Sequence, residues 1–387
     1  DGSLAVLHGR IIPAEALRLK RLVKNEDKRI MSGKRKMLIA AGLLLTPLAI
    51  VAMQVVVWLV SRTMSQREEC ARIVPVIADS RKAFADSLVR SGKTRVTVLL
   101  ENYKDPEIPG IEADHGISLF VERNGRSYVF DLGESGISVT NAASLGVDVA
   151  KVDAVFVSHG HIDHGGGLPA FLAKNTKAPV FLSVHAPEKH YRRLSFLKFD
   201  TSLAKNDPDL FTRFGDRFRF LSQDAMPVED IFAVTGIQGS SKRPSANEGV
   251  LAKGADGSVA ADDFAHEVAY VIRDDDGLIV YSGCNHNGLL NTLETVTKRF
   301  PGMRVKAVLG GFHLMNPITN RMEESESDVR AIAAELQTRY PGIKIYTGHC
   351  TGVEGYTILK SCLGESIEYF TTGSVFCIDW LFSDSVP

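Results

Sequence analysis

Ten residues, Ser158–Gly167, constrain this chain more than any other stretch, because they hold three histidines and an aspartate within six positions. Histidine is otherwise scarce, with 11 in a chain of 387 residues. The preceding run Val152–Val157 is apolar and rich in β-branched residues, which predicts a buried strand. Three glycines follow, and Leu168–Leu172 then predicts the start of a helix. The cluster therefore falls on a turn at the C-terminal end of a strand, where α/β proteins place their chemistry.

Imidazole nitrogens and carboxylate oxygens are ligands of Zn²⁺, which they bind at roughly 2.0–2.2 Å. Such ligands must converge on one or two points. A turn bounded by glycines permits this, because glycine adopts backbone angles that other residues resist. The alternative is a solvated loop that is merely rich in histidine. We interpret the cluster as a metal site for one or two zinc ions, and manganese or iron stays open because ligand type alone does not select among these metals.

The pattern His159-x-His161-x-Asp163-His164 resembles the HxHxDH signature of the metallo-β-lactamase superfamily. Further segments resemble one branch of it, which contains the archaeal dihydropterin–ribofuranosyl-aminobenzene-phosphate synthase and many uncharacterised metal-dependent hydrolases. These segments are Ala113–Ser118, Asp131–Gly133, Ser282–His286, Gly310–Leu314 and Gly348–Gly352. The resemblance spans residues 94–380. It implies an α/β fold of the metallo-β-lactamase type, an αββα sandwich with two mixed β-sheets between helical layers.

Several predicted strands run directly into a histidine, which independently supports one shared site at the edge of the sheets. Val152–Val157 precedes His159, Leu278–Tyr281 precedes His286, Met303–Leu309 precedes His313, and Ile343–Thr347 precedes His349. A further strand is predicted over Ala265–Ile272, with His266 inside it. Helices predicted over Gly288–Arg299 and Glu323–Tyr340 complete an alternating α/β order. The pair Asn124-Gly125, between two alternating runs, predicts a β-hairpin.

The resemblance also implies a ligand set. It places His159 and His161 on a first metal ion and Asp163 and His164 on a second, which His349 completes. In enzymes of this kind, paired ions lie roughly 3.5–4 Å apart.

The third ligand of the first ion is left open by the sequence. Ser282-Gly283-Cys284 stands where many superfamily members carry Thr-Gly-Asp, so the bridging carboxylate is missing. We favour His286 for this place, with His266 and Cys284 as alternatives. The missing carboxylate also leaves open whether one ion or two is bound.

Two residues are predicted to act in catalysis. Asp163 is expected to orient the nucleophilic water as well as bind metal, and His313, behind two glycines, to face the substrate. There it would bind an anionic group or stabilise the leaving group, with a purely structural histidine as the alternative. His115 is a candidate for the rim, and Asp131 either holds a ligand histidine in one tautomer or forms a turn. His185, at the end of another predicted strand, is expected to pack or hydrogen-bond rather than to bind metal.

The N-terminal part predicts a membrane anchor. Leu38–Val60 is 23 residues without a charge, long enough to cross a hydrocarbon core of about 30 Å. The alternatives are a cleaved signal peptide or a buried core helix. Lys34–Lys36 precede it, which places the N-terminus in the cytoplasm and the catalytic domain on the extracytoplasmic side of the cell (inner) membrane, as a single-pass protein.

The expected domain order follows from these segments. It is a basic segment over residues 1–37, an anchor over 38–60, a helical spacer over 61–93, and a catalytic domain over 94–387 in which 187–260 is an insertion or lid. Residues 1–37 carry ten Lys/Arg against four Asp/Glu, a net of +6, so with a total of −1 the remaining residues sum to −7. An acidic domain has no general attraction for nucleic acid. Five scattered cysteines do not make a disulfide framework.

These features together predict a metal-dependent hydrolase that uses metal-activated water on a phosphate ester, a lactone or a similar small ester. The expected partner is a small, anionic substrate, and the sequence indicates no particular oligomeric state. One alternative is a pterin-linked synthase that couples a pterin to an arylamine ribofuranosyl phosphate. Another is a non-catalytic metal-binding sensor ectodomain, against which the retention of the complete motif argues.

Overall fold

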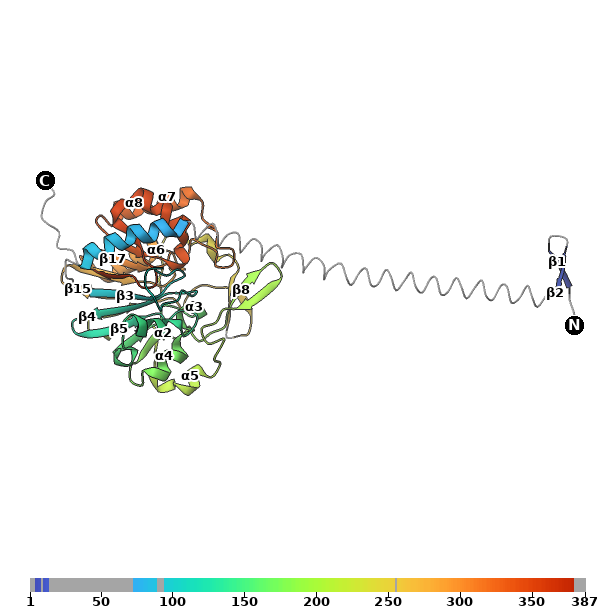
Figure 1. Cartoon of the computed structure of the whole chain (residues 1–387), viewed down its shortest axis with the longest axis horizontal. Coiled ribbons are helices and arrows are strands. Elements are labelled where there is room, and N and C mark those ends of the chain that lie inside the picture. The colour runs from blue at the N-terminus through green and yellow to red at the C-terminus, as the bar shows by residue number, and fades with distance from the viewer. Residues whose placement is uncertain (1–3, 8–9, 14–71, 89–93, 255, 379–387) are drawn as a thin grey trace. The chain divides into compact units, whose positions relative to one another are not determined.

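A computed structural model describes residues 4–7, 10–13, 72–88, 94–254 and 256–378 (Figure 1). The chain divides into two compact units, residues 1–64 and 65–387. In the first, strand β1 (Leu4–Leu7) pairs antiparallel with β2 (Arg10–Pro13). The predicted anchor over residues 38–60 lies outside the described residues. Within the part of the chain that is described, no helix is both long and apolar enough to cross a membrane.

Two seven-stranded sheets form the body of the second unit. The first has the order β10-β7-β6-β5-β4-β3-β20 and the second β11-β12-β15-β16-β17-β18-β19, and both mix parallel and antiparallel pairs. The first sheet consists of β3 (Thr94–Leu100), β4 (Ser118–Arg123), β5 (Arg126–Phe130), β6 (Ala154–Phe156), β7 (Val180–Ser183), β10 (Phe218–Leu221) and β20 (Val375–Cys377). The second consists of β11 (Ala225–Val228), β12 (Ile231–Val234), β15 (Ala269–Asp274), β16 (Gly277–Tyr281), β17 (Val305–Gly310), β18 (Lys344–Thr347) and β19 (Ile367–Tyr369).

Helices cover the outer face of each sheet, so the layers run α-β-β-α (Figure 1). The helices of this unit are α2 (Ile137–Ser144), α3 (Ile162–Gly165), α4 (Leu168–Lys174), α5 (Leu210–Arg213), α6 (Leu289–Arg299), α7 (Glu326–Arg339) and α8 (Gly352–Leu363). One apolar cluster packs α2 and α4 on the first sheet, a second packs α6, α7 and α8 on the other, and a third lies between the sheets. The sandwich predicted from the sequence is confirmed.

Residues 72–88 are helical, within the stretch predicted as a spacer. This helix packs on the domain, however, because Ile73 and Ile77 are buried in the outer cluster beside α6–α8. Phe84 is buried between the sheets and stacks on Phe376 with ring centroids 4.7 Å apart. The helix therefore belongs to the folded domain instead of standing between it and the preceding segment.

The predicted hairpin is confirmed. Asn124 and Gly125 have φ angles of 51° and 74° and join β4 to β5 in antiparallel register. Two positive φ angles are what a two-residue hairpin turn requires.

The strand predicted over Ala265–Ile272 begins later than expected, at Ala269. His266 lies in a turn before it, because Phe264 has a φ of 59° and its carbonyl accepts the N–H of Glu267.

Residues 187–260 are not wholly an insertion. They supply β10, β11 and β12 to the main sheets, and only the remainder forms a separate four-stranded sheet of order β14-β13-β8-β9. Its strands are β8 (His190–Leu194), β9 (Leu197–Asp200), β13 (Val250–Lys253) and β14 (Val259–Ala261). β10 is an edge strand of only four residues, Phe218–Leu221, so its sequence carries little periodic signal.

Candidate metal centre

The side chains predicted as ligands gather where strands of both sheets end. His159 and His161 follow β6, and Asp163 and His164 lie on the short helix α3 that comes next. Chains leaving β16 and β18 bring in further histidines. Among the described residues, four groups have all their potential ligand atoms within 4.8 Å of one another. The first is His159, His161 and His286, and the second is Asp163, His164, Cys284 and His349. The third is described below, and the fourth, Cys284, His286 and His313, shares residues with the first two.

Ring nitrogens approach one another closely in these groups. The Nε2 atoms of His159 and His286 are 3.3 Å apart. His164 Nε2 lies 3.1 Å from Cys284 Sγ, and His349 Nε2 lies 3.3 Å from Asp163 Oδ2. All of these histidines are buried. Cys284 thus lies with the group of the predicted second ion, and His286 lies against His159, the arrangement favoured by the sequence argument.

Three of these histidine rings, those of His164, His286 and His349, are each held in one orientation by a side-chain oxygen atom close to Nδ1. His164 Nδ1 is 2.6 Å from Asp131 Oδ2, and His286 Nδ1 is 2.9 Å from Asn247 Oδ1. The Asn247 amide nitrogen donates to a backbone carbonyl, which confirms that its oxygen faces the ring. Because these oxygens only accept, each Nδ1 carries the proton and each Nε2 turns a lone pair inward. Metal-binding histidines are typically held in this way.

The same arrangement holds His349, whose Nδ1 lies 3.0 Å from Asn102 Oδ1. Its backbone N–H donates to Glu101 Oε1 at 2.6 Å. Burial raises the pKa of Glu101 to about 8, against the hydrogen bonds that lower it. Both residues follow β3, and the sequence analysis passed over them because a Glu-Asn pair after a strand carries no distinctive pattern.

Asp131 is fully buried and accepts four hydrogen bonds. Its Oδ1 accepts the backbone N–H of Ser158 at 2.7 Å. Its Oδ2 accepts from the Ser158 hydroxyl at 2.7 Å, from the Tyr281 hydroxyl at 2.5 Å and from His164. Of the two roles considered for Asp131, holding a histidine tautomer is the one that these contacts support.

Most of the rings are neutral at neutral pH. Burial and neighbouring histidines lower the pKa of His159 and His286 well below the usual value, and burial lowers the pKa of His349 to about 4. His164 differs. Burial lowers its pKa, but Asp131 and Asp163 outweigh burial and leave that pKa raised. Burial also raises the pKa of the Cys284 thiol well above its usual value.

These residues fit a divalent metal ion. His161 Nε2 is buried without a hydrogen-bond partner among the described residues. A buried polar atom left without a partner costs about 1–3 kcal/mol, and a metal removes that cost by taking the lone pair. Imidazole, carboxylate and thiolate together suit zinc.

Comparison with known proteins agrees with this geometry. The family model described as the metallo-beta-lactamase superfamily matches residues 113–240, which include the histidine motif. The crystal structure of Tm1679, a metal-dependent hydrolase of the beta-lactamase superfamily, superposes with a TM-score of 0.61 at 26% identity and covers 74% of this chain and 100% of that one. Residues 113–240 therefore match the metallo-β-lactamase superfamily, and the two-sheet fold of the described residues is of that type.

The chain is also similar to two proteins of Methanocaldococcus jannaschii. It is 26% identical over 293 residues to 7,8-dihydropterin-6-methyl-4-(beta-D-ribofuranosyl)-aminobenzene-5'-phosphate synthase, covering 73% of this chain and 95% of that protein. It is 23% identical over 255 residues to an uncharacterized protein, covering 64% of this chain and 88% of that protein.

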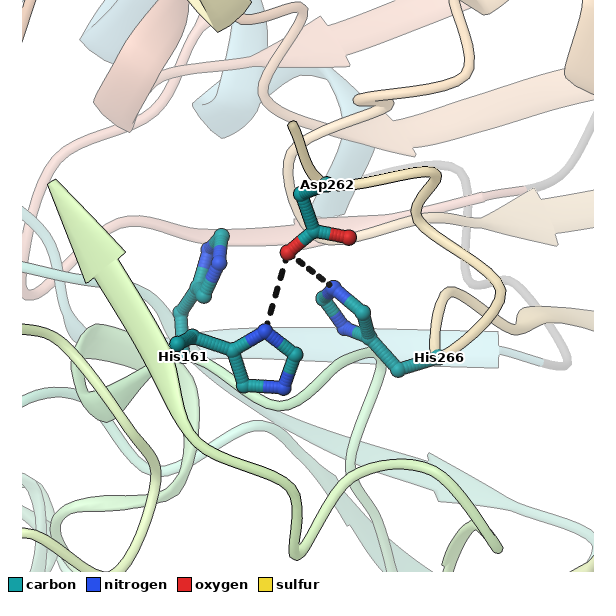
Figure 2. Close-up of side chains that lie close together, drawn as sticks. His161, Asp262 and His266 are labelled. Atoms are coloured by element: carbon teal, nitrogen blue, oxygen red, sulfur yellow. Dashed lines mark hydrogen bonds and ion pairs between the residues drawn. The ribbon is translucent and has the colours of Figure 1, made fainter. Parts of the chain in front are cut away.

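A third group of side chains lies beside the superfamily motif and includes His161, Asp262 and His266 (Figure 2). Asp262 Oδ2 is 3.2 Å from His266 Nε2. On the other side of the ring, His266 Nδ1 accepts the backbone N–H of Gly160 at 2.9 Å. A neutral His266 therefore carries its proton on Nε2 and has no lone pair free for a metal. This argues against His266 as the third ligand.

His190 completes this third group, and the sequence analysis missed it. Its Nδ1 lies 2.9 Å from Asp262 Oδ2, and its Nε2 is buried without a hydrogen-bond partner among the described residues. The nearby His185, which the sequence analysis weighed instead, is half-exposed and pairs with Glu188. His185 lies in the turn after β7, whereas His190 begins β8 at a buried position, and that difference is visible only once the strands are known.

His115 and His313 lie on either side of the centre. The His115 Nε2 atom is 3.9 Å from Asp163 Oδ2, and the ring is partly exposed, so it lies at the rim. His313 is buried, with its ring centroid 4.1 Å from that of His286 and neither ring nitrogen hydrogen-bonded to a described residue.

Proposed function

We propose that this chain is a metal-dependent hydrolase that acts on a phosphate ester, a lactone or a similar small ester. The observation that carries the proposal is the convergence of inward-facing histidine Nε2 atoms, from the ends of several strands, beside the carboxylate of Asp163. The match of residues 113–240 to the superfamily model, and the similarity to a metal-dependent hydrolase structure, support it. We propose zinc as the ion, with His159, His161 and His286 as one set of ligands and Asp163, His164, His349 and Cys284 as the other.

A divalent ion in such a centre supplies a water whose pKa falls to about 7. Burial raises the pKa of Asp163, but His164 and His349 outweigh it and hold that pKa well below its usual value. Asp163 therefore stays ionised at neutral pH, and its partly exposed carboxylate accepts a hydrogen bond that orients the attacking water.

His313 acts as a neutral ring in this proposal. Burial, followed by the charge of Arg192, lowers its pKa to about 3. A neutral imidazole donates one N–H, so His313 stabilises negative charge by a hydrogen bond. His313 does not protonate a leaving group as an imidazolium at neutral pH. Of the roles expected from the sequence, binding an anionic group or stabilising the leaving group by a hydrogen bond therefore remains.

Elemental analysis and turnover of the full chain test the proposal. His349→Ala should lose bound metal and at least about a hundredfold in kcat/KM on chromogenic phosphoesters or lactones, as second-sphere losses alone reach tenfold to a hundredfold. His185→Ala, which removes a half-exposed histidine outside the centre, is the matched control and should retain both. Undiminished turnover after thorough chelation would refute a metal-dependent reaction.

A synthase is the second candidate, favoured by the similarity to the M. jannaschii enzyme over 95% of that protein. Its test is direct: the full chain is incubated with a reduced pterin donor and an arylamine ribofuranosyl phosphate, and the coupled product is sought by mass spectrometry. Product formation without ester turnover would favour the synthase.

We also propose that residues 38–60 anchor the protein in the cell membrane with the catalytic domain outside the cytoplasm. The uncharged length and the preceding basic residues support this. Protease added to intact spheroplasts should digest the domain, and a domain that is protected until lysis would overturn the orientation.

A further inference from the structure

Arg192, on β8, is a buried cation without an anionic partner. Arg192 is 8% exposed, and no carboxylate of the described residues forms an ion pair with its guanidinium. One guanidinium nitrogen, Nη1, donates to the carbonyl of Ala246 at 2.7 Å. Its Nε is buried and has no hydrogen-bond partner among the described residues. Burial lowers the pKa of Arg192, and the charges of Glu323 and Glu248, which form no ion pair with it, raise that pKa only in part.

The chain contains a useful comparison in Arg123, which is 7% exposed. Arg123 donates to Asp274 Oδ1 at 2.8 Å and so has the charged partner that buried arginines ordinarily have. A buried charge without such a partner is strongly unfavourable. Arg192 is therefore expected to bind an anion that is not part of the chain.

The surroundings of Arg192 place it next to the candidate metal centre. Ala246 and Asn247 belong to one short 3-10 helix, η3 (Ser245–Asn247). Ala246 accepts from Arg192, while the next residue, Asn247, holds the His286 ring. On the same buried face of β8, two residues away, His190 lies against the histidine motif with its ring 5.3 Å from His161.

His313 also lies next to the His286 ring. Its ring is 4.1 Å from that of His286, and both of its nitrogens are buried without hydrogen-bond partners among the described residues. Arg192 and His313 therefore both lie next to the residues around the His286 ring, and both have buried side-chain nitrogens without partners among the described residues.

We propose that Arg192 and His313 form an oxyanion subsite that binds a phosphate or carboxylate group of the substrate. The inference rests on the proposed function for its placement, because the bound group would lie beside the bond that is hydrolysed. The planar guanidinium offers paired N–H donors that match two oxygens of either group. An imidazole has at least one N–H whatever its charge, so His313 adds a further donor.

Binding of inorganic phosphate and of acetate to the metal-loaded full chain tests the subsite by calorimetry. Arg192→Met keeps an unbranched apolar stem in place of the arginine stem and removes the charged guanidinium. It should weaken binding of the preferred anion by roughly 10- to 100-fold, the range expected for charge-assisted hydrogen bonds. Arg193→Met, at the exposed neighbouring position of β8, is the matched control and should bind like the wild type at equal metal content.

The possible outcomes distinguish a failure of the anion subsite from a failure of the proposed hydrolase function. A preference for phosphate or for acetate identifies the class of group bound, and failure of the wild type to bind either overturns the proposal. Arg192→Met binding that equals the wild type also overturns it. If no ester is turned over but anion binding still depends on Arg192, the proposed function fails and the subsite stands.

Turnover supplies a second readout. Arg192→Met should lower kcat/KM for an anionic ester several-fold more than kcat/KM for an uncharged lactone, with the difference appearing in KM. An equal loss on both substrates would contradict the subsite. If the methionine variant does not fold, Arg192→Lys replaces it, because lysine keeps the charge but lacks the paired N–H donors of the guanidinium. Weaker anion binding than in the wild type supports the proposal, and unchanged binding of both anions overturns it.

Discussion

Replacing Asp131 with asparagine tests whether this carboxylate sets the tautomer of His164. Asparagine suits the position because Asp131 has a φ of 54°, a conformation that Asn adopts more readily than most residues. An amide has only one accepting oxygen. If that oxygen takes the place of Oδ2, three of the hydrogen bonds survive, and the amide nitrogen meets the N–H of Ser158, which was 2.7 Å from Oδ1.

The hydrogen bond that Asp131 accepts from the Ser158 backbone is therefore lost, and that buried N–H is left without a partner. We expect the metal-free protein to lose about 1–3 kcal/mol in its free energy of unfolding, measured by urea denaturation. The loss of the negative charge behind His164 also makes its Nε2 a weaker ligand. Metal affinity, measured by competition with a chromophoric chelator, should fall about 10- to 100-fold.

Asp230→Asn is the matched control, because Asp230 has a φ of 61° and lies outside the centre, with its carboxylate 3.5 Å from Arg273. It should leave metal affinity unchanged. A lower stability of Asp131→Asn with unchanged metal affinity would refute the argument, since Asp131 would then support the turn and not the histidine.

Three further outcomes follow from other contacts. Burial raises the pKa of Asp274, but Lys306 and Arg123 outweigh it and lower that pKa to about 2. Stability gained from this carboxylate is thus full above about pH 4, and denaturation midpoints should fall as the pH drops towards 2. The fall should be smaller in Asp274→Asn, and an equal fall in both proteins would contradict the argument. His164 has a raised pKa, so metal binding should release a proton, seen as a buffer-dependent calorimetric enthalpy; an enthalpy independent of buffer would contradict it. The cobalt-substituted protein should show a thiolate-to-metal charge-transfer band that Cys284→Ser lacks, and a band retained by that variant would exclude Cys284 as a ligand.

The sequence could predict the layers and most of the strands because alternation and apolar runs report local structure directly. His159, His286 and His349 were also accessible, since each follows a strongly patterned strand. His190 and Arg192 were not, because β8 becomes a strand only by pairing with β9 and β13, which no local pattern records. The start of β15 was misplaced for a related reason: the turn at Phe264 is fixed by hydrogen bonds, while its sequence reads as apolar and extended.

A shared backbone feature explains why strand ends carry these side chains. Four non-glycine residues around the centre have positive φ: Asp131 at 54°, Asn285 at 57°, His313 at 49° and His349 at 51°. Each follows the end of a strand within a few residues. A residue with positive φ ends the extended conformation abruptly. Its side chain therefore leaves the up-and-down alternation of the strand and points towards the edge of the sheet. Such conformations cost of order 1–3 kcal/mol each and persist where the surrounding structure holds them. Here the holding contacts are the buried hydrogen bonds of Asp131 and the bond from the His349 backbone to Glu101. Asp131 thus both orients the His164 ring and stabilises a strained turn, whereas at His349 the two tasks fall to the neighbouring residues Asn102 and Glu101.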